Sequence, residues 1–414
     1  MQKKIKIILI SFFLLSVSVL ILGFTGCAKF ILGSKAEMEA MVKLSSSKFP
    51  DFRDDLNYEN LDESITQSLS YLLKRPADKK FKFANDIYTT SQMVESLEAF
   101  QKFIASRPPA DDLRDYIKTN YYVYKSTGND KNGRVLFTGY YEPELEGSLF
   151  KNDIYKYPVY GKPSDLVTID LSLFSLKYKG EKITGRYTGQ TVVPYYDRKQ
   201  IETGAIAENE AIVIAWVKDP VSLFFLQIQG SGKINLDNGE ILHVHYHATN
   251  GHPYKSIGAL LIQQDIIPRS EMSMQNIRKY LNSNPDKMHE ILNHNPSYVF
   301  FKPEQAGPFG YLEVKLTPQR SVALDKSIFP LSGLVYVETL KPDIDENGEI
   351  IAWSNYNKFV LAQDTGGAIR GPGRADLFWG NGKYAEIAAG NMQHEGNFYF
   401  LVLKPGVETG QKPK

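Results

Sequence analysis

The chain has 414 residues, 43% of them hydrophobic and 23% charged, so it is too long for one small domain and too polar for a membrane protein with several spans. This composition also excludes a disordered chain and a small protein held together by disulfides. The 48 lysines and arginines are balanced by 47 acidic residues, leaving a net charge of +1 that gives no sign of a nucleic-acid-binding protein.

The first 27 residues have the order of a secretion signal. Lys3, Lys4 and Lys6 precede an almost wholly apolar run over residues 7–24, and two small residues then lead to Cys27. This order predicts a signal peptide over residues 1–26. A cysteine directly after the cleavage site resembles that of a bacterial lipoprotein, which implies a lipid anchor on Cys27 in the outer membrane, facing the periplasm. The alternative is an uncleaved anchor helix, because about 18 apolar residues can just span a bilayer.

The mature chain is expected to begin with helices, from residue 28 to about residue 120. Met93, Leu97, Phe100 and Ile104 follow a spacing that places them on one helix face, and the prolines at 108–109 end that helix. A second helix is predicted directly afterwards, over residues 113–121.

From residue 134 the pattern changes to short strands separated by turn residues. Helical spacing returns over residues 254–294, and strands follow again. This order favours an α+β, mostly β protein over a doubly wound parallel sheet. The predicted strands are residues 211–217, 223–229, 233–236, 240–246 (joined to the previous strand by an Asp-Asn-Gly hairpin turn), 298–301, 311–316, 334–338, 358–363 and 397–404.

Two patterns imitate metal sites. His243, His245 and His247 alternate along one predicted strand and would share a face. The apolar residues between them would bury the other face, which leaves the histidines on the solvated side of a hairpin. Residues 343–354 begin like a calcium-binding loop but end in Ser354 in place of glutamate. The single cysteine excludes disulfides and cysteine-based metal sites. We predict no metal and no cofactor.

Residues 363–380 carry the strongest signal for chemistry. Asp364 closes a predicted strand, Gly366 and Gly367 let the backbone approach a ligand closely, and Asp376 follows a flexible loop. Two carboxylates brought to one cleft suit acid/base chemistry on a glycosidic bond. The Asp-Thr-Gly triplet also suggests an aspartic protease, which needs two such triplets or a homodimer, and the chain has one.

At this stretch the sequence resembles the membrane-bound lytic murein transglycosylase A (MltA) family, over about residues 134–404. The resemblance rests on six ordered blocks: residues 137–143 (FTGYYEP), 226–232 (LQIQGSG), 251–254 (GHPY), 295–301 (NPSYVFF), 317–321 (TPQRS) and 364–380.

The resemblance implies a C-terminal double-psi β-barrel marked by Asp325, Asp364 and Asp376, with a second β-rich domain inserted and the glycan in the groove between the two. The domains expected on this basis are a signal peptide at 1–26, a helical N-terminal part packing with the barrel at 27–143, an inserted β-rich domain with helices at 144–311, and the barrel at 312–414.

The resemblance also implies an enzyme that cleaves the β-1,4 bond between N-acetylmuramic acid and N-acetylglucosamine and leaves 1,6-anhydromuramoyl products. By motif match, Asp376 takes the catalytic position, as a single general acid and then base, with Asp364 as the supporting carboxylate and Asp325 in a structural role. The loop over residues 370–373 is slightly longer than in some members.

Substrate-binding residues are predicted beside this pair. Thr138 and Tyr140 would share one strand face, Gln227 and Gln229 another, and Trp379 would supply part of an apolar wall. The implied partners are peptidoglycan glycan strands, the outer membrane and proteins of cell-wall synthesis, but no nucleic acid. Two alternatives stay open: a hydrolytic peptidoglycan glycosidase, and a lipid-anchored peptidoglycan-binding protein without activity.

Overall fold

The computed structural model of the protein describes residues 39–130, 132–206 and 210–407. The predicted signal peptide and Cys27 lie outside the described residues. Ala40–Lys414 form one compact unit, and the description below concerns that unit. No helix among its described residues is long and apolar enough to cross a membrane.

Six strands close into a double-psi β-barrel, which confirms the predicted fold class. The strands pair in the order β19–β16–β17–β15–β18–β5, and β5 pairs back to β19, so the ring has no open edge. The pairs β15–β17 and β18–β5 are parallel. The barrel strands are β5 (Val135–Glu142), β15 (Ser321–Ala323), β16 (Leu334–Ile344), β17 (Ile350–Asp364), β18 (Arg374–Asn381) and β19 (Gln393–Leu403).

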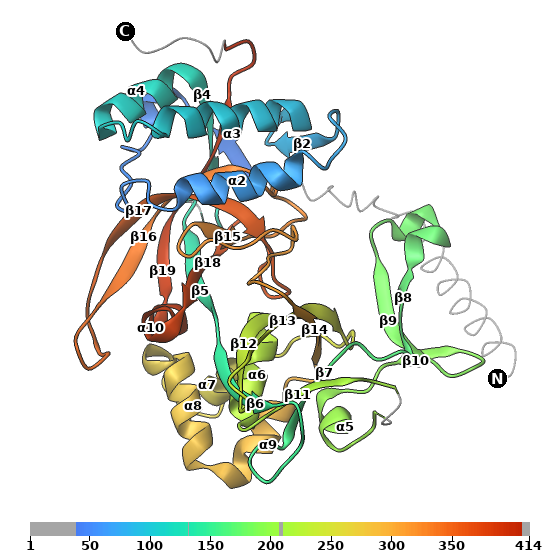
Figure 1. The fold of residues 1–414 in the computed structure, drawn as a ribbon. Helices are drawn as coiled ribbons and strands as arrows, with labels where there is room; N and C mark the ends of the chain where they lie inside the picture. Colours follow the sequence, from blue (N-terminus) through green and yellow to red (C-terminus); the bar gives the residue numbers. More distant parts are fainter. Residues whose placement is uncertain (1–38, 131, 207–209, 408–414) are drawn as a thin grey trace, which may run out of the picture. The chain divides into compact units, whose positions relative to one another are not determined.

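Three N-terminal helices cover one end of the barrel, and they are α2 (Leu61–Leu72), α3 (Thr90–Ile104) and α4 (Ala110–Asn120) (Figure 1). The predicted apolar face of α3 is confirmed, since all four of its expected core residues are buried. A capping box between Thr89 and Gln92 begins this helix by satisfying backbone N–H groups that have no partner within it.

The sequence predicted that the N-terminal part contains only helices, and this prediction is wrong. The N-terminal part also contains β1 (Met41–Lys43), β2 (Lys80–Phe83), β3 (Asp86–Thr89) and β4 (Tyr121–Ser126). In β2 and β3 the side chains alternate, and Phe81, Phe83 and Tyr88 are buried. Strands β4 and β1 extend the barrel sheet outward from β19. Strands β2 and β3 have only four residues each, and an alternation of buried and exposed side chains over four residues is too short to indicate a strand from sequence.

A second, six-stranded sheet lies on the other side of the barrel in Figure 1. Its strand order is β14–β13–β12–β6–β11–β7. The predicted hairpin is confirmed, because β12 and β13 pair antiparallel around the Asp-Asn-Gly turn. The strands are β6 (Glu144–Ser148), β7 (Tyr157–Tyr160), β11 (Val213–Val217), β12 (Ser231–Leu236), β13 (Ile241–Thr249) and β14 (Val299–Glu304).

The strand predicted over residues 223–229 is a helix, α6 (Pro220–Gln229). The prediction followed the aromatic and branched residues of this segment, but the ends of the segment decide its structure. Asp219 accepts hydrogen bonds from the backbone N–H groups of Val221 and Ser222, and Pro220 occupies the first turn, where its missing N–H costs nothing. Gly230, with φ of 82°, ends the helix.

The remaining elements complete the second half of the unit. The helical region predicted over residues 254–294 is confirmed, but residues 311–316 form a loop and not a strand, with Glu313 at a positive φ of 56°. A small three-stranded sheet stands apart from the other two. These elements are α5 (Arg198–Glu202), α7 (Ile257–Gln263), α8 (Met274–Ser283), α9 (Pro285–Asn293), α10 (Gly382–Asn391), β8 (Leu166–Asp170), β9 (Lys182–Tyr187) and β10 (Val192–Pro194).

Candidate active site

Strand pairing brings the two predicted catalytic aspartates into one row. Ala323 of the short strand β15 is the register partner of Asp364 on one side and of Asp376 on the other. On the next strand, Thr138 of β5 is the partner of Asp376. The Cα atoms of the aspartates are therefore two strand spacings apart, roughly 10 Å. Because Ala323 has only a methyl group, the space between the carboxyl groups is not filled by a longer side chain.

Asp376 is half-buried and accepts one strong hydrogen bond. The Thr138 hydroxyl donates to its Oδ1 at 2.6 Å. Within the part of the chain that the structure describes, Oδ2 has no hydrogen-bond donor. Burial raises the pKa of the Asp376 carboxyl, and the Thr138 hydrogen bond and the positive charge of Arg374 reduce that rise.

Asp364 has three donors. The Tyr140 hydroxyl donates to Oδ2 at 2.9 Å, while the backbone N–H groups of Tyr311 and Thr365 each donate to Oδ1 at 2.8 Å. Burial raises the pKa of Asp364 to about 6, the three hydrogen bonds oppose the rise, and the negative charge of Asp376 adds to it. The loop that replaces the predicted strand over residues 311–316 therefore supplies one of these donors.

The hydrogen bonds distinguish the two carboxyl groups. All three donors to Asp364 stabilise an ionised carboxylate, which accepts at both oxygens. Asp376 has one oxygen held and one free, so a proton on the free oxygen meets no competing donor. A negative Asp364 also favours the protonated form of Asp376. Burial raises the pKa of both carboxyl groups, with the larger rise at Asp364, so the pair can share one proton; the pattern of donors favours Asp376 as the group that carries it.

Asp325 belongs to a different contact. It accepts hydrogen bonds from Ser327 and from the backbone N–H of Gly371, and Arg370 lies 3.8 Å away. Burial alone would raise the pKa of Asp325, but these hydrogen bonds outweigh it and the pKa is lowered. Asp325 therefore holds the loop between Asp364 and Asp376 in place; a structural role is also what the family resemblance implies for it.

The predicted substrate-binding residues divide into two groups. Thr138 and Tyr140 share a face of β5, as predicted, and each binds one of the aspartates. Gln227 and Gln229 do not share a strand face, because they lie on α6, where residues two apart point in nearly opposite directions. Gln227 is only 4% exposed and lies beside the Tyr298 hydroxyl, whereas Gln229 accepts a hydrogen bond from the Tyr141 backbone.

Trp379 packs in the core and does not form an open wall for a sugar. Its side chain is 2% exposed, stacks on Tyr356 with ring centroids 5.9 Å apart, and contacts Tyr384 edge-on. Because side chains alternate along β18, Trp379 faces the side of the strand opposite to Asp376 and Phe378. A Cβ atom on Gly139 would come within 2.6 Å of the indole nitrogen, so β5 can lie this close only with glycine there.

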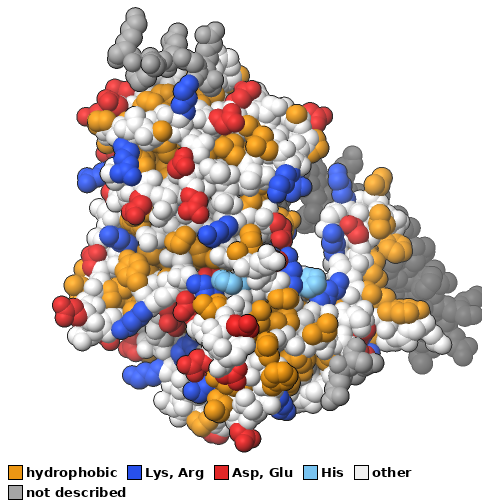
Figure 2. Space-filling model, in the orientation of Figure 1, with side chains coloured by type: hydrophobic (Ala, Val, Ile, Leu, Met, Phe, Trp, Pro, Cys, Tyr) orange, Lys and Arg blue, Asp and Glu red, His pale blue; other side chains and the backbone are white. Residues whose placement is uncertain are grey.

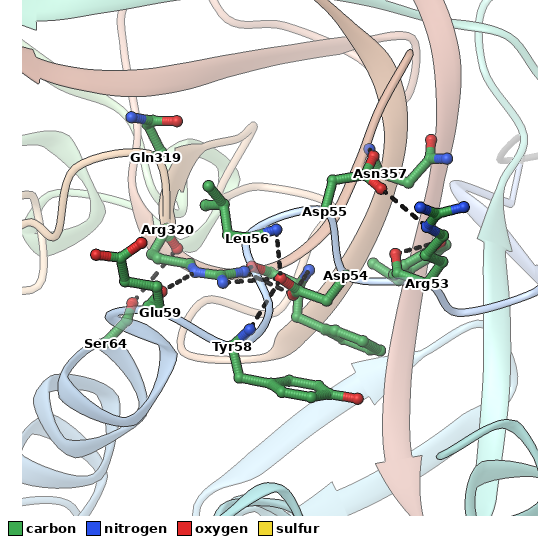
Figure 3. Close-up of polar contacts among 12 residues, drawn as sticks. Arg53, Asp54, Asp55, Leu56, Tyr58, Glu59, Ser64, Gln319, Arg320 and Asn357 are labelled. Atoms are coloured by element: carbon green, nitrogen blue, oxygen red, sulfur yellow. Dashed lines mark hydrogen bonds and ion pairs between the residues drawn. The ribbon is translucent and has the colours of Figure 1, made fainter. Parts of the chain in front are cut away.

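The N-terminal segment contacts the start of β15 through Asp54 and Arg320 (Figure 3). Asp54 and Arg320 form a buried ion pair at 2.7 Å, with Asp54 1% and Arg320 0% exposed. Arg320 also donates to the backbone carbonyls of Glu59 and Phe359. Arg320 directly precedes β15, the strand that separates the two aspartates. Sequence analysis missed this contact.

Gln363, the residue before Asp364, makes a second link to the same segment. Its side chain is fully buried, donates to the Ser64 carbonyl and the Ser68 hydroxyl of α2, and accepts from the Ser321 hydroxyl. A glutamine that ends an apolar strand was the available signal, because such an amide needs partners. Asp364 is therefore anchored through its neighbour to α2.

The three histidines of β13 do not form a shared solvated face. His245 is buried and packs against Phe309 with ring centroids 6.2 Å apart, whereas His247 lies at a bulge between Tyr246 and Ala248 and is exposed. Burial lowers the pKa of His245. His243 lies 3.8 Å from the buried Glu142. Across the described ranges no group of three or more histidine, cysteine or acidic side chains is placed to hold a metal ion.

Two domain-family models match the chain. The model described as MltA specific insert domain matches residues 136–302, and the model described as 3D domain matches residues 320–402. The first match spans the second sheet and the second match spans most of the barrel strands.

Individual proteins and solved structures are similar to the chain as well. Membrane-bound lytic murein transglycosylase A of Vibrio cholerae is 31% identical over 282 residues, which cover 67% of this chain and 68% of that protein. The crystal structure of membrane-bound lytic murein transglycosylase from Agrobacterium tumefaciens is similar with a TM-score of 0.71 and 29% identity, covering 88% of this chain and 98% of the other. Escherichia coli MltA with bound chitohexaose has a TM-score of 0.69 and 25% identity, covering 89% and 95%.

Proposed function

The chain belongs to the membrane-bound lytic murein transglycosylase A family and is a peptidoglycan lytic transglycosylase, and we propose that it cleaves the β-1,4 bond between N-acetylmuramic acid and N-acetylglucosamine to leave 1,6-anhydromuramoyl ends. The observation that carries this proposal is the row formed by Thr138, Asp376, Ala323 and Asp364, in which two half-buried carboxyl groups lie on either side of one small residue.

In the first step, protonated Asp376 donates its proton to the glycosidic oxygen. The bond from that oxygen to C1 of the muramoyl residue breaks, the N-acetylglucosamine part leaves as an alcohol, and positive charge develops at C1. The free oxygen of Asp376 is the atom from which the proton departs, because Thr138 holds the other. Burial raises the pKa of Asp376 and so favours the protonated acid that this step needs.

In the second step, the carboxylate formed on Asp376 removes the proton from the C6 hydroxyl of the same muramoyl residue. The C6 oxygen attacks C1 and closes the 1,6-anhydro ring, so Asp376 ends the cycle protonated. The nucleophile is part of the substrate, and its high effective concentration replaces water. Asp364 stays ionised, favours the proton on Asp376 and stabilises the positive charge that develops at C1.

The substrate is proposed to be a glycan strand that passes Thr138 and Tyr140. The buried Gln227 and Trp379 are assigned to packing, and Gln229 contributes by holding the backbone beside Tyr141. The similarity to E. coli MltA with bound chitohexaose supports a β-1,4-linked sugar chain as the ligand class. The inserted domain at 144–311 and the barrel, formed by residues 312–414 together with β5, would form the two walls of the binding groove.

We also propose that the protein is an outer-membrane lipoprotein that faces the periplasm, with signal peptide 1–26 removed and the anchor on Cys27. Relatives are named membrane-bound, which supports attachment to a membrane in general. A tethered enzyme of this kind would meet peptidoglycan strands and the proteins that synthesise them.

The decisive test compares the wild type with Asp376→Asn on purified sacculi, with products identified by mass spectrometry. We expect anhydro-ended products, lighter by one water than reducing ends, from the wild type, and a fall in rate of at least about 100-fold in the variant. Asp286→Asn, at an exposed position of α9, serves as the matched control and should keep full activity.

Other outcomes would point elsewhere. Reducing ends would identify a hydrolytic glycosidase that uses Asp364 as base. Glycan binding with no released muropeptides from either protein would identify a binding protein. Full activity in a correctly folded Asp376→Asn variant would refute the assignment of the acid.

A further inference from the structure

The small sheet of β8, β9 and β10 carries three large apolar side chains that point into solvent. Two of them lie on the short 3₁₀ turns η2 (Leu171–Leu173) and η3 (Leu176–Tyr178), and the third, Phe174, lies between these turns, which connect β8 to β9. Leu173 is 85% exposed, Phe174 75% and Leu176 87%. We refer to these three residues as the apolar tip.

The apolar tip is held in shape by local hydrogen bonds. Asp170 caps η2 by accepting from the backbone N–H and the hydroxyl of Ser172, and Ser175 caps η3 by accepting from the N–H of Lys177. The N–H of Leu171 donates to the carbonyl of Glu181 across the base of the turns. The backbone thus presents the apolar side chains outward in a defined conformation, where neighbouring exposed apolar residues mark an interaction surface.

Basic residues surround the apolar tip. Lys177, Lys179 and Lys182 are exposed, and Lys182 lies 3.7 Å from Asp170 in an ion pair. With Glu181 as the second acidic residue, residues 170–182 carry a net charge of +1, and within the described part of the chain Lys177 and Lys179 are its lysines without an ion pair. Figure 2 shows hydrophobic and basic side chains side by side over this part of the molecule. An apolar centre with lysines around it is complementary to a lipid bilayer, which has an apolar acyl-chain interior and can carry negatively charged headgroups.

We propose that the apolar tip docks on an anionic lipid bilayer, with Leu173, Phe174 and Leu176 inserted below the headgroups and the lysines on lipid phosphates. Charge complementarity favours a bilayer over a second copy of the chain, since two basic tips would repel. The 12 residues between Cys27 and Ala40 allow a tether of at most about 40 Å. The inference uses the lipid anchor proposed above, but it is independent of the catalytic assignment.

Docking at two points would fix the orientation of the enzyme at the membrane. A single point of attachment alone leaves the protein free to rotate. An anchor keeps the weak tip close to lipid, which raises its effective concentration and makes a contact of modest affinity sufficient.

The test places a tryptophan at the apolar tip of the full chain reconstituted in vesicles of phosphatidylethanolamine and phosphatidylglycerol. We expect the added fluorescence of Phe174→Trp to fall at least about twofold when the lipids carry brominated acyl chains, which quench only inserted indoles. Leu73→Trp is the matched control, because Leu73 is an apolar residue of similar exposure, 67%, at the end of α2. Its added fluorescence should not change.

Two further variants separate the contributions. Leu173→Ser with Leu176→Ser, in the Phe174→Trp background, should abolish quenching, and Lys177→Glu with Lys179→Glu should reduce it. Activity on soluble glycan fragments should be unchanged in all of them, so failure of this inference is distinct from failure of the proposed function. Equal quenching at positions 174 and 73, or no quenching at either, would overturn the inference. The inference would also be overturned if the indole introduced by Phe174→Trp became more protected from quenching as the protein concentration rises. That result would indicate that a second copy of the chain covers the apolar tip.

Discussion

The Thr138 hydroxyl donates to Asp376 at 2.6 Å across the parallel pair of β5 and β18. These residues are 238 positions apart in the sequence, and the closure of the barrel makes them direct neighbours. The contact fixes one carboxylate oxygen and stabilises the ionised form of Asp376 against the effect of burial. Thr138 is therefore placed to set both the orientation and the pKa of the proposed acid.

Thr138→Val should lower kcat about 10- to 100-fold, the range for loss of a hydrogen bond to a charged group. The hydrogen bond lowers the pKa of Asp376, so its removal raises that pKa. Because the reaction needs protonated Asp376, activity falls as pH rises through this pKa, and the alkaline limb of the kcat profile should move to higher pH. Thr138→Ser keeps the hydroxyl and should keep the wild-type profile. An unmoved limb in Thr138→Val would show that Asp376 is not the group that limits activity at high pH.

Tyr140→Phe should act on the opposite limb. The Tyr140 hydroxyl lowers the pKa of Asp364, which lies at about 6, so its removal should raise that pKa. Because Asp364 is proposed to work as a carboxylate, activity is lost as pH falls through about 6 in the wild type and at higher pH in the variant. A pH–rate profile of each protein measures the shift. A move of the alkaline limb alone would mean that the two aspartates have exchanged roles.

Local patterns predicted the parts of the fold that local physics controls. The apolar face of α3, the β12–β13 hairpin and the alternation of Thr138 and Tyr140 all follow from the spacing of residues along one element. The helix α6 was missed because its residues favour strands, whereas Asp219, Pro220 and Gly230 at its ends favour a helix. End signals should therefore have outweighed composition in this segment.

Long-range contacts could not be predicted in the same way. Asp54 and Arg320 are separated by 266 residues, and neither lies in a pattern that indicates a buried partner. Trp379 follows Asp376 closely in the sequence, but strand alternation sends it into the core. Trp379 therefore lies close to Asp376 in the sequence without facing the candidate active site.

Asp54→Ala should lower the free energy of unfolding by about 3–5 kcal/mol, because it leaves the guanidinium of Arg320 buried without its counter-charge. Arg53→Ala provides the neighbouring control, since Arg53 is 76% exposed in its pair with Asp55 and should contribute less than about 1 kcal/mol. Urea unfolding of both variants measures the difference (both pairs are drawn in Figure 3). Equal losses would show that the buried pair is not a stabilising link between the N-terminal segment and β15.

Lys358→Met should stabilise the protein at neutral pH. Lys358 is fully buried in β17, with its Nζ 3.7 Å from the ring centroid of Tyr356 and 5.4 Å from that of Trp379, and burial lowers its pKa well below the ordinary 10.5. Between the lowered pKa and pH 10.5, Lys358 binds a proton in the unfolded chain but not in the folded chain. The free energy of unfolding therefore decreases as the pH falls through this range. Methionine has a similar length and removes this loss, so the variant should unfold at a higher urea concentration at pH 7. Urea unfolding between pH 6 and 10 should show a smaller slope of stability with pH in the variant, whereas an unchanged slope would mean that Lys358 keeps its proton inside the barrel.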